Sequence, residues 1–227
     1  MSDDQQVRYL SFVMSPASPV PPAIQPAQIR QKMQVSGGDE ANVYRVSFDN
    51  HSNTHVDAPA HVIADGLCIT DFALADFLFY RPVVVDLSLP DGTEINPDHI
   101  KPHLGTIRDA DMVLFRLGYG PVRREDPQRY ATRCPGFGVA GAEFLRRELP
   151  YVRAVGMDVP SFVCIESIEK TMRGHNVMLE GEGRRCLLIE DMDLEINLDH
   201  LRQVRLVPWL IEGIDSSPCT VLGIFDD

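Results

Sequence analysis

Six short runs of apolar and β-branched residues constrain the fold of this chain more than any other feature. They are VYRVSF (43–48), PVVVDL (82–87), MVLFRL (112–117), RAVGMD (153–158), CLLIED (186–191) and TVLGIF (220–225). Runs of this composition are typical of strands. Helical patterns lie between some of them. Such alternation predicts an α/β or α+β fold with a mixed sheet and flanking helices, and the strand order stays open.

Three stretches between these runs have helical features. Asn96 and Pro97 are typical of a helix cap and a first-turn proline, and Pro102 should end or kink that helix. Residues 138–149 place apolar side chains at helical spacing with charged residues between them. A third helix could begin near Ser161 and continue through SIEKTMRGHNVML.

Size and charge limit the class of protein. A chain of 227 residues can bury a sizeable core, and 44% hydrophobic with 24% charged residues is ordinary for a globular protein, so we expect one domain over residues 1–227. The formal charge of −12 argues against a nucleic-acid or anionic-membrane partner, because phosphate binding needs clustered Lys and Arg. A small-molecule substrate is the expected partner.

The N-terminus and the cysteines indicate a cytoplasmic location. MSDDQQVRYL carries two Asp residues where a secretory signal has a basic start, and no apolar run has membrane-spanning length. The five cysteines are odd in number, widely spaced and without a CxxC pair. Neither a disulfide framework nor a cysteine-based zinc site is therefore expected.

One segment is rich in proline, SPASPVPPAIQP (15–26). Its prolines exclude helix and favour an extended path. The segment could form a wrapping arm or the edge of a pocket.

The densest chemical signal is HSNTHVDAPAH, which holds His51, His55, Asp57 and His61 within eleven residues. Imidazole and carboxylate are ligands that Zn²⁺, Mn²⁺ or Fe²⁺ accept. All four positions are odd, so an extended chain would send the four side chains to one face. The alternative is a polar loop with solvated histidines, and four potential ligands on one face favour a functional site.

The backbone of this segment must bend to bring its ligands together. Pro59 excludes a regular helix. A straight strand from His51 to Asp57 would span roughly 20 Å, whereas metal–ligand bonds are about 2 Å. Asn53 suits the bend, because Asn tolerates left-handed backbone angles.

Further ligands should come from strand or helix ends that converge on this loop. Glu190 ends the apolar run CLLI, where α/β enzymes often place functional groups, and His175 precedes it by fifteen positions. Taken alone, each has an ordinary alternative as a structural or solvated residue. Four other residues are left outside the site: Asp158, which suits a turn or supports a ligand, and His99, His103 and His200.

Residues 51–61 resemble the signature HxGTHxDxPxH of the cyclase or kynurenine formamidase-like metal hydrolases. The similarity extends over nearly the whole chain, through VVVDL (83–87), VLFRLG (113–118), PGF (135–137), AVGMDVPS (154–161), GHNVML (174–179) and LLIEDMDL (187–194). This resemblance implies a swivelling β/β/α fold that forms homodimers or homotetramers.

The resemblance also implies roles for individual residues. The metal ligands would be His51, His55, Asp57, His175 and Glu190. The first three of these would hold one ion, and Asp57 would bridge to a second ion held by the last two. His61 would be the catalytic acid/base.

The chain departs from the family pattern in three places. Asn53 replaces the family glycine, and no aspartate follows Ser161, where Phe162 and Val163 stand. The N-terminal arm of kynurenine formamidases tends to carry a Trp that covers an aromatic substrate, whereas the only Trp here is Trp209. N-formylkynurenine is therefore not the expected substrate.

The sequence favours a metal-dependent hydrolase that cleaves an amide or formamide or opens a cyclic amide. One or two divalent ions, Zn²⁺ or Mn²⁺, would bring the pKa of bound water near neutrality and polarise the carbonyl. His61 would then pass a proton to the departing amine. A metal-dependent lyase or dehydratase, and a non-catalytic binding protein on the same scaffold, are the alternatives.

Overall fold

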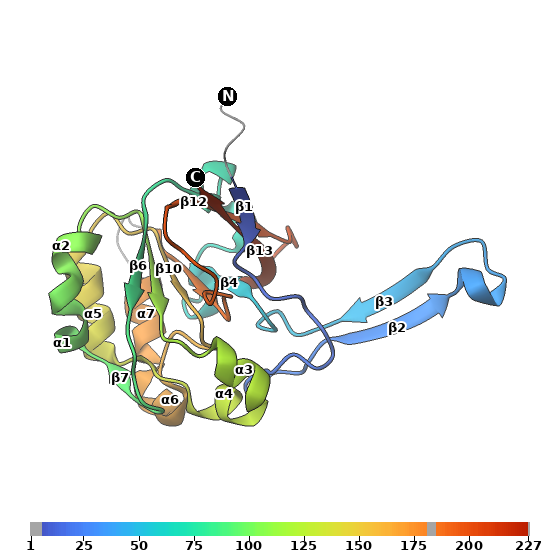
Figure 1. The fold of residues 1–227 in the computed structure, drawn as a ribbon, viewed down its shortest axis with the longest axis horizontal. Coiled ribbons are helices and arrows are strands. Elements are labelled where there is room, and N and C mark those ends of the chain that lie inside the picture. Colours follow the sequence, from blue (N-terminus) through green and yellow to red (C-terminus); the bar gives the residue numbers. More distant parts are fainter. Residues whose placement is uncertain (1–5, 181–184, 227) are drawn as a thin grey trace.

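The computed structural model, which describes residues 6–180 and 185–226, contains one large mixed sheet (Figure 1). In spatial order its strands are β5 (Leu78–Phe79), β12 (Leu201–Pro208), β13 (Ser216–Phe225), β4 (His55–Asp57), β11 (Leu187–Glu190), β10 (Ala154–Met157), β8 (Met112–Arg116) and β6 (Pro82–Asp86), and β1 (Gln6–Tyr9) pairs with β13. Strands β11, β10, β8 and β6 are parallel, and the other pairs are antiparallel. The expected α/β fold with a mixed sheet and flanking helices is confirmed.

Short helices connect these strands. In the described residues they are α1 (Pro97–Ile100), α2 (Leu104–Ile107), α3 (Gly120–Glu125), α4 (Pro127–Arg133), α5 (Val139–Glu148), α6 (Ile168–Thr171) and α7 (Arg173–Leu179). The helix predicted over 138–149 is confirmed as α5. The helix predicted from Ser161 begins only at a 3-10 turn, Ile165–Ser167, because the preceding backbone is extended and Val163 bridges to Phe137.

The predicted start of the first helix is confirmed in its details. The Asn96 side chain accepts a hydrogen bond from the Asp98 backbone N–H (3.0 Å), and Pro97 is the first helical residue. Around Pro102 the chain tightens into a 3-10 turn, Lys101–His103, before α2 continues. Proline therefore kinks this segment instead of ending it, since a 3-10 turn accommodates the missing N–H.

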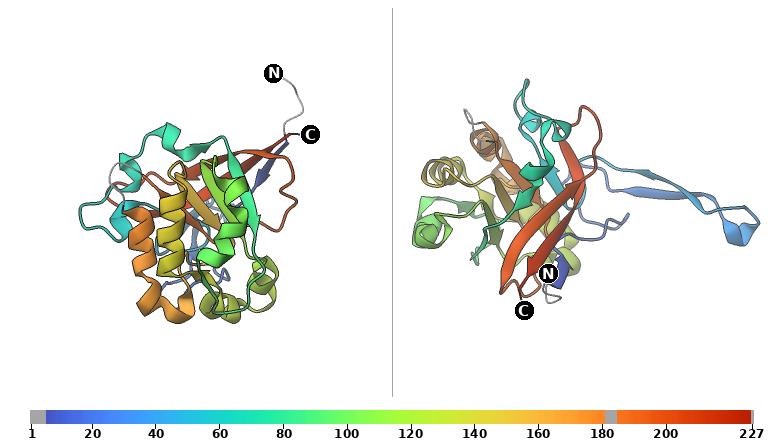
Figure 2. Two further views of the ribbon diagram at one scale, coloured as in Figure 1. Left: turned by 90° about the vertical axis from the view of Figure 1, so that its left-hand side faces the viewer. Right: turned by 90° about the horizontal axis from the view of Figure 1, so that it is seen from above.

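Three of the parallel strands, β8, β10 and β11, are buried on both faces. On one face Val113 and Phe115 of β8 pack with residues of α5 and α7, which lie side by side over the sheet (Figure 2). On the other face Met112 and Leu114 pack with residues of β12 and β13. Covering of both faces explains why these strands appear in the sequence as continuous apolar runs.

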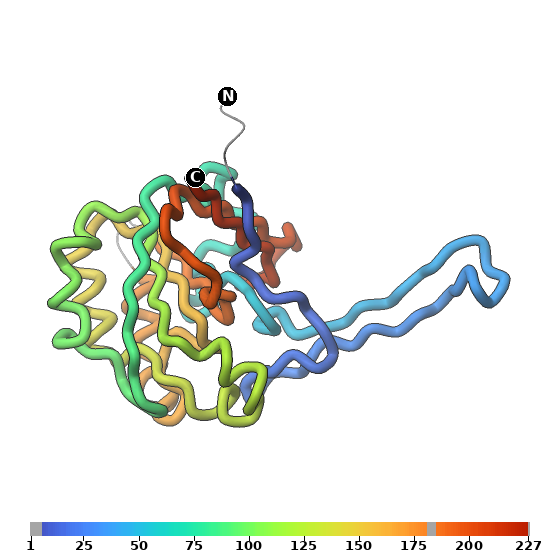
Figure 3. Tube along the Cα trace, viewed as in Figure 1, coloured from blue at the N-terminus to red at the C-terminus, as the bar shows by residue number. Residues whose placement is uncertain are grey.

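The run VYRVSF forms a strand but lies outside the large sheet. It is β3 (Val43–Ser47), which pairs with β2 (Gln28–Met33) in a hairpin that extends away from the body (Figures 1 and 3). Every residue of both strands is exposed. A second small pair joins β7 (Glu94–Ile95) to β9 (Gly136–Phe137). No helix in residues 6–180 and 185–226 is long and apolar enough to cross a membrane.

Candidate metal centre

Strand β4 carries the centre of the histidine-rich segment and lies between β11 and β13. His55 and Asp57 point to one side of the sheet, and Val56 packs into the core on the other, as strand alternation requires. Asn53 has φ 61°, so the predicted left-handed bend is confirmed. The 3-10 turn Pro59–His61 then brings His61 back toward the strand.

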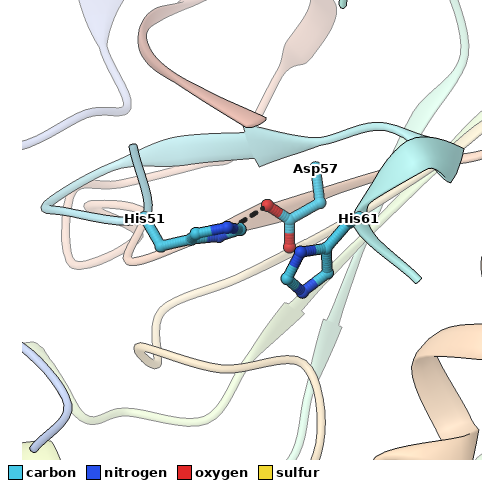
Figure 4. Close-up of side chains that lie close together, drawn as sticks. All are labelled: His51, Asp57 and His61. Carbon is cyan, nitrogen blue, oxygen red and sulfur yellow. Dashed lines mark ion pairs between the residues drawn. The ribbon is translucent and has the colours of Figure 1, made fainter. Parts of the chain in front are cut away.

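The side chains of this segment converge on the Asp57 carboxylate. His51 Nδ1 lies 3.2 Å from Asp57 Oδ1, and His55 Nε2 lies 3.6 Å from the same oxygen. The rings of His51 and His61 are 4.4 Å apart between centroids. Figure 4 shows His51 and His61 approaching Asp57 from separate turns of the loop. The curled path required for metal binding is therefore present.

Strand β11 and helix α7 add the two candidates from the second half of the chain. Glu190 pairs in register with His55, and its Oε2 lies 3.3 Å from His55 Nε2. The other oxygen, Oε1, lies 3.2 Å from His175 Nε2 and accepts a hydrogen bond from the Phe162 backbone N–H (2.6 Å). The ring of His175 lies 5.4 Å from that of His61. All six predicted site residues thus lie together, and their individual roles stay predictions.

Two groups of these side chains have the spacing needed to hold a metal ion. One comprises His51, Asp57 and His61, and the other comprises His55, Asp57 and Glu190, with ligating atoms within 4.8 Å of one another in each group. Asp57 belongs to both, which agrees with the bridging role implied by the family resemblance. The partition differs from that expectation, because His61 joins the first group, His55 lies with Glu190, and His175 belongs to neither group.

Four buried ligating atoms in this cluster have no hydrogen-bond partner among the described residues. They are His55 Nε2, both carboxylate oxygens of Asp57 and His175 Nδ1. Buried polar atoms are normally paired, and leaving them unpaired is costly. His55 Nδ1 donates to the Asn53 carbonyl (2.8 Å), which leaves Nε2 directed at the cluster. These residues therefore fit a divalent cation, because imidazole and carboxylate are suitable ligands and four of their buried atoms have no partner in the described chain.

The electrostatics of the cluster also suit a cation. Burial alone would lower the pKa of His51, but its contacts with the Asp215 and Asp57 carboxylates raise it to about 10. Burial and the neighbouring Asp57 would raise the pKa of Glu190, yet hydrogen bonds from His175 and other histidine contacts lower it to about 2. The carboxylates are therefore ionised, and their negative charge favours the binding of a cation in this buried site.

Asp215 is a member of the site that the sequence analysis missed. Its Oδ2 lies 3.0 Å from His61 Nδ1 and 3.3 Å from His51 Nε2, and its Oδ1 accepts from Asn50 Nδ2 (2.9 Å). Hydrogen bonds to His51 and His61 keep its pKa well below the usual range. No signal in the sequence indicates it, because the last predicted strand covers 220–225, whereas Asp215 lies directly before β13, whose Ser216 pairs with Asp57.

The residues left outside the site have structural partners or lie apart from the two groups. Asp158 accepts backbone N–H bonds from Leu117 (2.7 Å), Gly118 (2.8 Å) and Tyr119 (3.1 Å), which makes it a turn former. His99 Nδ1 accepts from a backbone N–H at the start of α1. Within the described chain, neither His103 nor His200 joins a metal-binding group.

A cavity of about 420 Å³ opens beside the cluster. Its polar floor consists of His51, His61, His175 and Glu190. The apolar part of its lining comes from two segments of the chain, the first with Pro21, Pro22, Ala23 and Ile24 and the second with Pro160, Ile165, Ile168 and Met172. The proline-rich segment is therefore a pocket edge, one of the two roles expected for it.

Comparisons with known proteins place this geometry among related folds. The Cyclase family model matches residues 9–162. Isatin hydrolase A from Labrenzia aggregata, bound to benzyl benzoate, has a TM-score of 0.81 and 20% identity, with 98% of this chain and 94% of that chain covered. Isatin hydrolase A from Ralstonia solanacearum has a TM-score of 0.82 and 24% identity, with 98% and 92% covered. An uncharacterized protein from Haemophilus influenzae is 23% identical over 111 residues, which are 49% of this chain and 78% of that protein.

Proposed function

Since the chain belongs to the cyclase family, we propose that it is a metal-dependent hydrolase of carbon–nitrogen bonds other than peptide bonds. It would cleave an amide or formamide or open a cyclic amide. The observation that carries the proposal is the set of buried, unpartnered ligating atoms of His55, Asp57 and His175 beside an open cavity. A purely structural metal site is closed by its own ligands, whereas a catalytic site keeps access for substrate.

Five side chains would hold one or two divalent ions, Zn²⁺ or Mn²⁺. They are His51, His55, Asp57, His175 and Glu190. When bound, such an ion polarises a substrate carbonyl and makes water a nucleophile at neutral pH. Mixed imidazole and carboxylate ligands accept both metals, so the ligand set does not choose between them.

His61 would move the proton in this reaction. Its Nδ1–H donates to the Asp215 carboxylate (3.0 Å), which fixes the ring and leaves Nε2 able to accept a proton from water and deliver it to the leaving nitrogen. The same carboxylate stabilises the ring when it is protonated. Because His61 also lines the cavity, its ring is accessible to a bound substrate.

The cavity walls favour a small, neutral and largely apolar substrate. Apart from the floor, the lining is almost entirely proline and aliphatic side chains, with Ser161 as the exception. Among the described lining residues there is no Lys or Arg to pair with a substrate carboxylate. An amino-acid substrate such as N-formylkynurenine is therefore disfavoured, and the isatin hydrolases found as structural neighbours make isatin, a neutral cyclic amide, the first compound to test.

The experiment is a turnover screen on protein stripped of metal and reloaded with Mn²⁺ or Zn²⁺. Isatin, other neutral cyclic amides, linear formamides and N-formylkynurenine would be compared by mass spectrometry. We expect cyclic amides to give a single product heavier by one water and linear formamides to give the free amine and formate, with neutral cyclic amides preferred and Asp57→Ala inactive. Products lighter by one water would indicate a dehydratase, and tight binding without turnover of any compound would indicate a binding protein.

A further inference from the structure

Two left-handed residues stand beside the ligands His55 and Glu190. Asn53 has φ 61° and Asp191 has φ 53°. The Asn53 carbonyl accepts a hydrogen bond from His55 Nδ1 (2.8 Å), and Asp191 directly follows Glu190 in the chain. The conformation of each left-handed residue therefore sets the direction of a neighbouring ligand.

A largely buried arginine in α3, Arg123, joins these two residues. Arg123 Nε and Nη2 donate to the two carboxylate oxygens of Asp191 (2.7 and 2.8 Å), and Nη2 also donates to Asn53 Oδ1 (2.9 Å). The Arg123 side chain is 10% exposed and that of Asp191 is 3% exposed. The guanidinium lies 3.9 Å from the centre of the Phe12 ring, and the Phe12 carbonyl accepts from Asn53 Nδ2 (2.9 Å).

The Arg123 contacts link the segment that carries His55 to the segment that carries Glu190 at the point where pairing of β4 with β11 has ended. The ladder between β4 and β11 ends at the pair of His55 with Glu190. Beyond that pair the segments are joined by the Arg123 contacts and by the Thr54 hydroxyl, which donates to the Asp191 carbonyl (2.5 Å). Nothing in the backbone conformation requires the Asn53 side chain, since glycine adopts a positive φ without strain.

We infer that Arg123 and Asn53 are positioning residues that fix the spacing between the loop that carries His55 and the strand that ends at Glu190. The inference rests on the proposed function, because it concerns the ligands of the proposed metal. The two ligating atoms, His55 Nε2 and Glu190 Oε2, are 3.3 Å apart, so a small shift of either segment changes their separation appreciably. Arg123 Nη2 donates to both segments while Nε holds the second oxygen of Asp191, and the flexible ammonium of a lysine does not reproduce this bidentate geometry.

The test is a calorimetric titration with Mn²⁺ of metal-free Asn53→Gly, Arg123→Lys and the double variant, together with their melting temperatures before metal is added. We expect each single variant to bind Mn²⁺ about 10- to 100-fold more weakly, the usual effect of losing a residue that orients a ligand. The double variant should bind no more weakly than Arg123→Lys alone, because both changes break one connection. Arg124→Lys is the matched control, since Arg124 lies on the same helix but pairs with Glu195 at the surface, and its affinity should not change.

Two results separate this inference from the proposed function. If Asp57→Ala binds Mn²⁺ as the wild type does, the metal site itself is wrong. If Asp57→Ala loses binding while Asn53→Gly and Arg123→Lys keep the wild-type affinity and only melt at lower temperature, these residues are structural and the inference is overturned. Should Arg123→Lys fail to fold, Asn53→Gly decides alone, because it keeps the Arg123–Asp191 ion pair.

Discussion

Two ligating side chains of the candidate centre, His55 and Glu190, are each held by a backbone partner that fixes which atom faces the cluster. The Asn53 carbonyl takes His55 Nδ1, and the Phe162 N–H takes Glu190 Oε1. Such partners set ring orientation and tautomer before any ion arrives. The site is therefore organised by hydrogen bonds from outside the ligand set.

Asp57 is the residue whose replacement should do the most damage to metal binding. Its two oxygens are buried and unpartnered, and it belongs to both groups with metal-binding spacing. We expect Asp57→Ala to lose bound metal after dialysis, measured by elemental analysis. Asp86→Ala, which removes a surface carboxylate paired with Arg116, is the control and should retain metal. Full metal content in Asp57→Ala would contradict the bridging assignment.

His61 should separate proton transfer from metal binding. We expect His61→Asn to keep its metal and to lose turnover by about 10²- to 10⁴-fold, the usual contribution of a general acid/base. Metal content and turnover would be measured on the same preparation, with His99→Ala, remote from the cluster, as control. Lost metal would instead make His61 a ligand, as its grouping with His51 and Asp57 permits.

At the scale of elements, the sequence predicts strands that form continuous apolar runs and misses strands in which polar residues interrupt the apolar ones. Strands β8, β10 and β11 are apolar on both faces and were predicted. Strand β12, LRQVRLVP, alternates buried and exposed residues, and β2, QIRQKM, is exposed throughout and mostly polar, so neither stands out as an apolar run. Their pairing depends on distant partners, which leave no local signal.

The residue types of the site could be predicted from the sequence, but the strand pairings that bring these residues together could not. The histidine-rich segment indicates its own ligands, and its bend follows from Asn53 and Pro59. The approach of Glu190 comes from pairing of β4 with β11, and that of Asp215 from pairing of β4 with β13. The order of strands in the sheet determines both approaches, and the alternation of apolar runs with helical patterns in the sequence does not predict that order.

The turn after β8 depends on one buried carboxylate. Asp158 accepts three backbone N–H bonds, from Leu117, Gly118 and Tyr119. An amide at this position would point an NH₂ group at one or more of these donors. We expect Asp158→Asn to lower the free energy of unfolding by about 2 kcal/mol, the cost of a buried donor left unpaired, measured by urea denaturation.

A matched control for this prediction lies at the start of α4. The Asp126 side chain accepts from the Arg129 backbone N–H (3.0 Å) as an exposed helix cap, and asparagine caps helices as well as aspartate does. Asp126→Asn should therefore leave the unfolding free energy nearly unchanged. Equal midpoints for the two variants would show that the Asp158 carboxylate is dispensable.

At the scale of the whole molecule, two apolar surfaces lie away from the core. The β2–β3 hairpin extends from the body (Figure 1), and Ile29 and Val46 face each other across its strands at 47% and 44% exposure. Separately, Tyr9, Val13 and Trp209 are exposed around a cavity of about 490 Å³. A two-stranded hairpin is marginally stable alone in water, so a partner surface would stabilise it.

We expect the protein to be a homodimer or homotetramer whose contact includes the Ile29–Val46 face of the hairpin. Burial of these side chains between subunits removes apolar surface from water, and closed symmetric assemblies repeat such a contact on every subunit. Light scattering at micromolar concentration should give a multiple of the monomer mass for the wild type and a monomer for Ile29→Glu with Val46→Glu. The control places the same charges on the opposite face of the same hairpin, Gln28→Glu with Ser47→Glu, a pair adjacent in register, and should stay assembled. A monomeric wild type would refute the assembly, and equal dissociation of both double variants would show that the contact is not specific to the apolar face.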